Sequence, residues 1–305
     1  MIARHLRVPL LLCLLGPASL VPSGAQEADG TGSLISHARA QAACNRAQFA
    51  VALDVGHTAE QPGAMSARGV PEFAFNLMLA ERIERALREA GFDKTRLLIT
   101  DGKAKPSLFM RVAHAADVDA DLFLSIHHDA TPQKFKETWE FEGRALEYSD
   151  RFTGHSIFVS SDHASYRASL AFARQLGLQM KARGLAYTPH YTEAFMGPRR
   201  RQLVDAEAGV YRFDELVVLR RTSMPAVLLE GGMIVNRDDE SQLASAEHQT
   251  LVSAAVTEAV ERFCAAQAVP EVSATRRPRP TPKSQAPVLA GSSRKVSLPT
   301  LPGRD

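Results

Sequence analysis

The sequence predicts an α/β protein with a mostly parallel sheet flanked by helices. Short apolar stretches rich in β-branched residues alternate with longer stretches whose apolar residues recur at helical spacing, and this alternation favours parallel strands joined by helices. Of the 305 residues, 45% are hydrophobic, which is enough to bury a core and excludes a chain that is disordered throughout. We therefore expect one main domain between two end segments of different composition.

The expected strands and helices follow one another from Phe49 to Cys264. The first strand, 49–57, ends in Gly-His, and the helix after it is opened by Pro71 and closed by Gly91. The other strands are expected at 95–100, 120–130, 154–161 and 226–232, and the other helices at 107–119, 168–184 and 241–264.

Both ends of the chain differ from this middle part. Residues 1–25 have a cationic start, an apolar run and a small-residue site before Gln26, which is typical of a cleaved secretory signal peptide. The run is shorter than the ~20 residues of a bilayer span, so we expect no transmembrane segment in the mature chain and a periplasmic or secreted protein. The composition further predicts a linker at 26–47, the folded domain at 48–265 and a disordered, basic, Pro-rich tail at 266–305.

Charge and cysteine content narrow the possibilities further. The formal net charge is only +2, which gives no nucleic-acid-binding signature. Cys13 lies in the signal peptide, so Cys44 and Cys264 remain as a pair flanking the domain. After export they could form a disulfide between the two ends of the domain, and two separate buried thiols are the alternative.

Polar residues stand where three of the expected strands end: His57, His127 and Glu230. Open parallel sheets place their sites at the carboxyl ends of strands, and Glu72, at the start of the following helix, can point back over the same edge. Two imidazoles and one carboxylate are a common set of ligands for catalytic zinc, with a fourth position left for water. We therefore predict a Zn²⁺ ion held by His57, Glu72 and His127.

Each of these residues also has an ordinary structural explanation. A Gly-His pair after a strand is often a turn, Glu72 suits the first turn of a helix, and His127 with His128 can cap a buried strand. Glu230 follows an apolar run, where an ionised carboxylate is costly unless it has a partner or a solvated cleft. Beside a metal-bound water it could take up a proton and deliver it to a leaving amine.

Four motifs, in this order, resemble the zinc-dependent N-acetylmuramoyl-L-alanine amidases of bacterial cell-wall remodelling: LDVGH (53–57), Glu72 with NLMLA (76–80), ADLFLSIHHDA (120–130) and PAVLLEGGMIVNRDDE (225–240). The resemblance implies a phosphorylase/hydrolase-like α/β fold, with one Zn²⁺ held by His57, Glu72 and His127 and with Glu230 as the catalytic carboxylate. It also implies the reaction, hydrolysis of the amide between the lactyl group of N-acetylmuramic acid and L-alanine of the peptidoglycan stem peptide.

The chain departs from the family pattern at His128 and Asp129, where a small residue and Asn often stand, so His128 is a rival ligand or a substrate contact. The stretch 133–152 resembles an insertion. It could form a lid, a solvated acidic loop, or a regulatory helix like that of some division amidases, with Glu137, Glu140 or Glu142 on the zinc. A further feature, the basic cluster 199–201, could hold a stem-peptide carboxylate or lie in an exposed loop.

The family resemblance favours a zinc amidase over two alternatives. One is another zinc peptidoglycan hydrolase, a carboxypeptidase or deacetylase, and the other is an inactive wall-binding or division-complex protein. The chain has no G-x-S-x-G, Walker or H-E-x-x-H motif, which argues against serine hydrolases, nucleotide-binding proteins and classical zincins. The sequence leaves open whether an activator protein is required and what the oligomeric state is.

Overall fold

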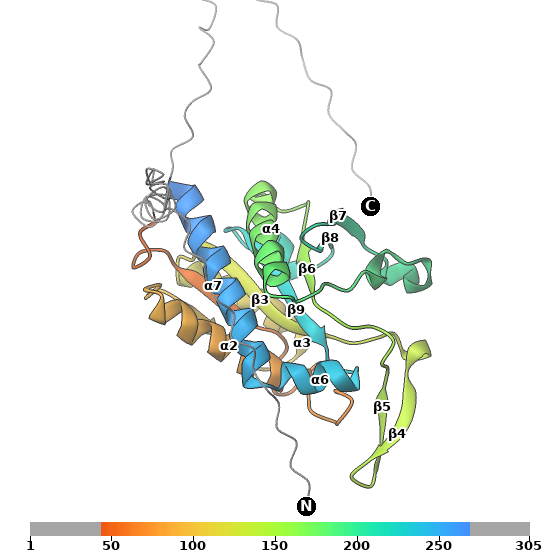
Figure 1. Ribbon diagram of the computed structural model, residues 1–305. Coiled ribbons are helices and arrows are strands. Elements are labelled where there is room, and N and C mark those ends of the chain that lie inside the picture. The colour runs from red at the N-terminus through yellow and green to blue at the C-terminus, as the bar shows by residue number, and fades with distance from the viewer. Residues whose placement is uncertain (1–43, 269–305) are drawn as a thin grey trace, which may run out of the picture. The chain divides into compact units, whose positions relative to one another are not determined.

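The computed structural model describes residues 44–268 (Figure 1). The signal peptide expected at 1–25, most of the linker expected at 26–47 and nearly all of the tail expected at 266–305 lie outside the described residues. Between Cys44 and Ala268, no helix is long and apolar enough to cross a membrane.

The centre of the fold is a seven-stranded sheet with the strand order β2-β1-β3-β9-β6-β8-β7. The strands are β1 (Val51–Val55), β2 (Arg96–Leu98), β3 (Leu122–Asp129), β6 (Ser156–Val159), β7 (Gln202–Asp205), β8 (Val210–Arg212) and β9 (Ala226–Met233). Strands β2, β1, β3 and β9 run parallel to one another, and β6 runs parallel to β8. Two pairs are antiparallel, β6 with β9 and β7 with β8. The predicted mostly parallel α/β sheet is confirmed.

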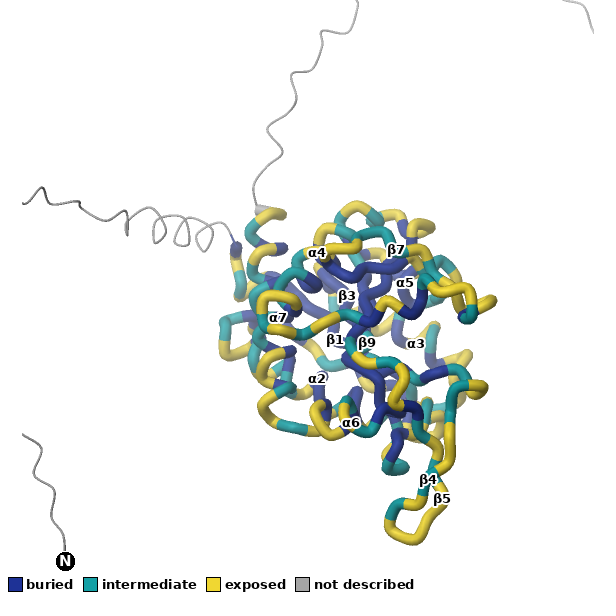
Figure 2. The backbone as a smooth tube through the Cα atoms, turned by 45° about the vertical axis from the view of Figure 1, so that its right-hand side comes forward, coloured by how far each residue is buried: buried dark blue, intermediate teal, exposed yellow. Residues whose placement is uncertain are grey.

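Helices cover both faces of this sheet (Figure 1). One face packs against α2 (Glu72–Glu89), α4 (Tyr166–Ala182) and α7 (Ala246–Ala268), and the other packs against α3 (Ala104–Asp117) and α5 (Val217–Arg221). Alternate strand residues face the two layers: Leu124 and Ile126 of β3 belong to the first core, and Phe123 belongs to the second. Figure 2 shows the buried residues concentrated in these central strands.

Two expected helices differ most from their predicted bounds. The helix expected at 107–119 begins at Ala104, because a proline, here Pro106, is tolerated in a first helical turn. The helix expected at 241–264 is two helices, α6 (Arg237–Leu243) and α7. At the break between them, the Ser245 Oγ accepts a hydrogen bond from the His248 backbone N–H at 3.2 Å, which caps the start of α7.

The segment expected to be a lid, a loop or a regulatory helix contains a β-hairpin, after the short 3₁₀ helix η1 (Gln133–Phe135). Strands β4 (Glu137–Phe141) and β5 (Arg144–Tyr148) pair antiparallel, and Glu142 and Gly143 between them have φ values of 51° and 73°, which is the backbone of a tight hairpin turn. Glu137, Glu140 and Glu142 are exposed. The regulatory-helix hypothesis is therefore wrong for this structure, because the turn and the alternating pattern favour paired strands.

The hairpin projects from the rest of the domain (Figure 2) and is attached to it through the aromatic side chain of Trp139. The indole N–H of Trp139 donates to the Ala67 carbonyl at 2.9 Å. The guanidinium groups of Arg68 and Arg237 lie 5.7 and 5.1 Å from the Trp139 ring centroid. The hairpin therefore contacts the loop that leads into α2.

Cys44 and Cys264 form a disulfide, with 5.3 Å between their Cα atoms. Of the two alternatives that the sequence leaves open, the structure has the bonded pair. The bond joins the segment before β1 to the last turns of α7 and lies beside the core residues Phe49 and Phe263. It therefore closes the domain at the ends of its chain.

Candidate metal centre

His57 follows the carboxyl end of β1 and is held there by the backbone. The N–H of Gly56 donates to the Ile126 carbonyl at 2.9 Å, which continues the pairing of β1 with β3. His57 itself has φ 68°, an uncommon conformation for a non-glycine residue. A Cβ atom at Gly56 would lie 2.4 Å from the His127 Nε2 atom, so only glycine allows the two histidines to approach each other here.

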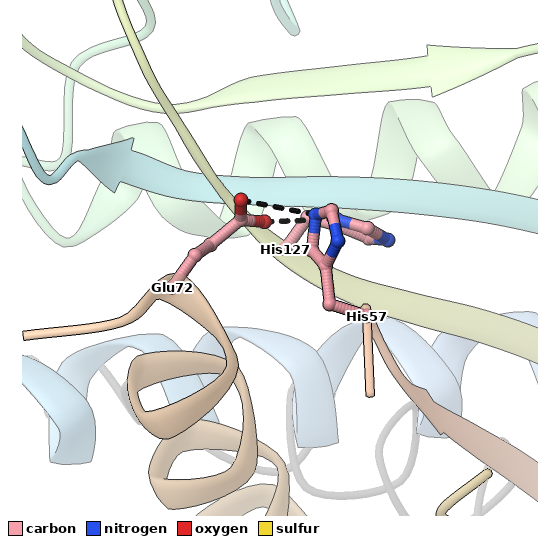
Figure 3. A group of neighbouring side chains, drawn as sticks. All are labelled: His57, Glu72 and His127. Carbon is pink, nitrogen blue, oxygen red and sulfur yellow. Dashed lines mark hydrogen bonds and ion pairs between the residues drawn. The ribbon is translucent and has the colours of Figure 1, made fainter. Parts of the chain in front are cut away.

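Glu72 is the first residue of α2, and its carboxylate faces both imidazoles (Figure 3). Its Oε2 atom is 3.0 Å from the His57 Nε2 atom, and its Oε1 atom is 3.0 Å from the His127 Nδ1 atom. The Ala64 backbone N–H also donates to Oε2 at 3.1 Å. Burial raises the pKa of Glu72, but the hydrogen bonds from His127 and His57 more than offset this and hold the pKa well below its ordinary value.

The predicted ligands His57, Glu72 and His127 therefore come together, and their donor atoms fit a zinc ion. One ligand atom from each lies within 4.8 Å of the others. Two atoms bound to tetrahedral zinc are separated by about 3.4 Å, so small side-chain rotations would bring these atoms to that spacing. Two imidazole nitrogens and one carboxylate oxygen are also the ligand types that zinc prefers.

Glu230 lies next to His127 across the sheet. The two residues are register partners in the parallel pair β3 and β9, and both line one pocket of about 480 Å³ together with His57. The Oε2 atom of Glu230 is buried and has no hydrogen-bond partner within the described chain. Burial, with the nearby charges of Asp129 and Glu72, raises the pKa of Glu230 well above its ordinary value, and Arg199 lowers it by less.

His128 points to the opposite face of β3 and does not join the three ligands. Its Nδ1 atom lies 2.8 Å from the Asn76 Oδ1 atom of α2, and its ring packs against Phe75. Burial lowers the pKa of His128 to about 3, which favours the neutral ring. The strand alternation that directs His127 into the site directs His128 into the helix layer.

A buried ion pair, which we did not predict, supports the His57 loop. The Arg111 guanidinium of α3 is 2% exposed and contacts the Asp54 Oδ2 atom of β1 at 3.4 Å, the Thr100 Oγ1 atom at 3.2 Å and the His57 carbonyl. Ser125 Oγ donates to the same Asp54 oxygen at 2.6 Å. The signal in the sequence was Asp54 itself, because a carboxylate within an apolar strand requires a partner.

The basic cluster is divided by the structure. Arg199 and Arg201 line the pocket that contains Glu230, whereas Arg200 does not. Arg220 and Arg221, in α5, are not part of the pocket lining. Tyr191, a further lining residue, donates its hydroxyl to the Asp129 Oδ2 atom at 2.6 Å, and burial raises the pKa of Asp129 to about 6.

Together, the fold and this site define a class: α/β proteins with a His/Glu/His candidate metal centre beside an unpaired carboxylate, an arrangement suited to metal-assisted hydrolysis. The family model described as N-acetylmuramoyl-L-alanine amidase matches residues 51–262. The chain therefore belongs to the N-acetylmuramoyl-L-alanine amidase family, as its motifs predicted, and this membership supports amidase activity on peptidoglycan.

Individual relatives agree with this assignment. The chain is 25% identical over 268 residues to the N-acetylmuramoyl-L-alanine amidase AmiA of Escherichia coli (strain K12), covering 80% of this chain and 88% of AmiA. The catalytic domain of the amidase CwlV from Bacillus (Paenibacillus) polymyxa is 25% identical, with a TM-score of 0.50 over 70% of this chain and 96% of that domain. The amidase Ami1 from Mycobacterium smegmatis shares the fold, with 20% identity and a TM-score of 0.55 over 73% of this chain and all of Ami1 (100%).

Proposed function

We propose that this protein is a zinc-dependent enzyme that hydrolyses the amide between the lactyl group of N-acetylmuramic acid and L-alanine of peptidoglycan stem peptides. The observation that carries the proposal is the shared pocket. In it the Glu230 carboxylate, with one oxygen that has no hydrogen-bond partner in residues 44–268, stands beside two histidines that contact Glu72. A metal-assisted hydrolysis needs both parts, a metal site with an open position and a group that moves protons.

The roles of the residues follow from their positions. His57, Glu72 and His127 would hold Zn²⁺, which when bound polarises the substrate carbonyl and lowers the pKa of water. Glu230 takes a proton from the water that attacks the amide carbon and donates a proton to the leaving nitrogen of L-alanine. Its register position beside His127 in the sheet supports this role.

The second part of the proposal concerns where the enzyme works. Its substrate lies outside the cytoplasmic membrane, so we infer that residues 1–25 direct export to the periplasm or beyond and are then removed. In this proposal 48–265 is the catalytic domain and 26–47 is a linker. The disordered tail at 266–305 stays a prediction, and whether an activator protein is required stays open.

The test is mass spectrometry of purified peptidoglycan after incubation with the mature protein, with zinc or with a chelator. We expect zinc-dependent release of stem peptides that begin with L-alanine. E230Q should bind zinc and lose most turnover, H127A should lose zinc as measured by elemental analysis, and the exposed hairpin variant E137Q should behave like the wild type.

Other products would change the assignment. Single amino acids or acetate would identify a zinc carboxypeptidase or deacetylase instead. An E230Q variant with near-normal turnover would exclude the proposed proton transfer. Binding to peptidoglycan with no product, both alone and with activator candidates, would favour an inactive wall-binding protein.

A further inference from the structure

Three successive arginines precede β7. The first of them, Arg199, is the last residue of the 3₁₀ helix η3 (Ala194–Arg199), and the three have different environments. Arg199 and Arg201 line the pocket that contains Glu230. Arg200 does not line it, and its Nε atom instead donates to the Thr192 carbonyl at 2.8 Å. Two of the three guanidinium groups are therefore placed where a substrate would lie.

The positive charge of Arg199 is only partly compensated. Its Nη2 atom donates to the Ala130 carbonyl at 3.3 Å and lies 3.6 Å from the Asp129 Oδ1 atom, beyond ordinary hydrogen-bond distance. The Asp129 carboxylate already accepts hydrogen bonds from the Tyr191 hydroxyl at 2.6 Å and from the Ala130 N–H at 2.7 Å. With a side chain 46% exposed, Arg199 has donors left for a ligand.

Arg201 has no carboxylate partner among the residues that the structure describes. It forms no ion pair with an acid anywhere between Cys44 and Ala268. Its Nη1 atom donates to the backbone carbonyls of Pro198 at 2.9 Å and Arg200 at 3.0 Å, while its guanidinium lies 3.7 Å from the Phe213 ring centroid. The Nε atom is buried and has no hydrogen-bond partner in the described part of the chain. These contacts hold the group in place and leave its charge uncompensated.

The rest of the pocket explains why this charge matters. The pocket is also lined by two acids, Glu230 and Asp129, and each would repel an anionic substrate whenever its carboxyl group is ionised. Another part of the lining is apolar, with Leu108, Val218 and Leu228, and such surroundings strengthen interactions between charges. A negative group of the substrate is therefore favoured beside the two arginines and disfavoured beside Glu230.

We propose that Arg199 and Arg201 bind a carboxylate of the stem peptide on the leaving side of the scissile amide, so that the enzyme selects stem peptides in which this carboxylate is free. The inference rests on the proposed function and names the part of the substrate that the site recognises. Planar guanidinium groups bind carboxylates through paired hydrogen bonds, which fixes both the position and the direction of the peptide.

The test compares three muramoyl tetrapeptides with purified zinc-loaded enzyme: one with free carboxylates, one amidated at the second residue and one amidated at the third. We expect one of the two amidations to lower kcat/KM of the wild type by about ten- to a hundredfold, mainly through KM, since a hydrogen bond to a charged group is lost. R199Q and R201Q should show the same loss on the free substrate and little further loss on the amidated one. R200Q should behave like the wild type.

A control separates binding from folding. R201K keeps the charge and should retain a preference for the free carboxylate, which a merely structural role would not produce. Equal wild-type rates on all three substrates would overturn the inference while leaving the amidase proposal intact. No hydrolysis of any of them, or of whole peptidoglycan, either alone or with activator candidates, would reject the amidase proposal, and the inference with it.

Discussion

Replacing Arg111 by methionine should lower both stability and zinc affinity, for two separate reasons. Asp54 is completely buried, and Arg111 is its cationic partner. Removing one member of a buried ion pair leaves the other charge uncompensated, which costs about 3–5 kcal/mol in the free energy of unfolding. The variant should also lose the hydrogen bond to the His57 carbonyl, which supports a residue with φ 68°. Removing a group that orients a metal ligand typically lowers metal affinity about 10–100-fold.

A second substitution separates the two effects. In the double variant D54N/R111M the buried carboxylate charge is gone, so the free energy of unfolding should return to within about 1–2 kcal/mol of the wild type. The contact with His57 is still missing, so zinc affinity should stay low. Urea unfolding of the metal-free proteins measures the first quantity, and competition with a chromophoric chelator measures the second. Unchanged zinc affinity in R111M would refute the supporting role of Arg111, and a double variant as unstable as R111M would refute the charge argument.

Replacing both Cys44 and Cys264 by serine should lower the free energy of unfolding by about 5 kcal/mol, because the bond spans 220 residues; a loss below about 1 kcal/mol in urea titrations would contradict this. Burial lowers the pKa of His155 from 6.5 to about 4, so the unfolded chain protonates this histidine at a higher pH than the folded protein does. Stability should therefore be full above pH 6.5 and fall by about 3 kcal/mol towards pH 4, and H155Q should flatten this loss; equal slopes would argue against it. A chelator should lower the Tm of the zinc-loaded protein without changing its circular dichroism at room temperature, since the three ligands stand on elements held by the core; loss of secondary structure would show that the metal is needed for folding.

The sequence was sufficient to predict which residues the fold brings together at the candidate site, because their positions follow from strand geometry. His57, His127 and Glu230 each lie at or near the end of an apolar, β-branched run, and parallel strands bring such ends to one edge. The structure adds the register, which places His127 beside Glu230. The role of His128 could not be predicted from the sequence. Alternation along the strand places His127 and His128 on opposite faces of the sheet, but it does not say which of the two faces the site.

Other features depend on contacts between distant segments and had weak local signals. Strands β7 and β8 are short and lie at one edge of the sheet, so neither has a long apolar pattern. The hairpin β4–β5 is stabilised in part by aromatic contacts with Arg68 and Arg237, which are far away in the sequence. The pairing of Asp54 with Arg111 likewise spans 57 residues. The sequence shows only that the buried Asp54 carboxylate needs a partner, not which residue provides it.

The disulfide has a practical consequence for access to the enzyme. Cys44 precedes the amino end of β1, and Cys264 lies in the last turns of α7, so the two ends of the folded part meet at one place. His57 and His127 stand towards the carboxyl ends of β1 and β3, at the opposite edge of the sheet. A fusion partner or surface tether joined at either end would therefore be attached on the side of the domain away from the pocket, and would leave the pocket open to a bulky glycan strand.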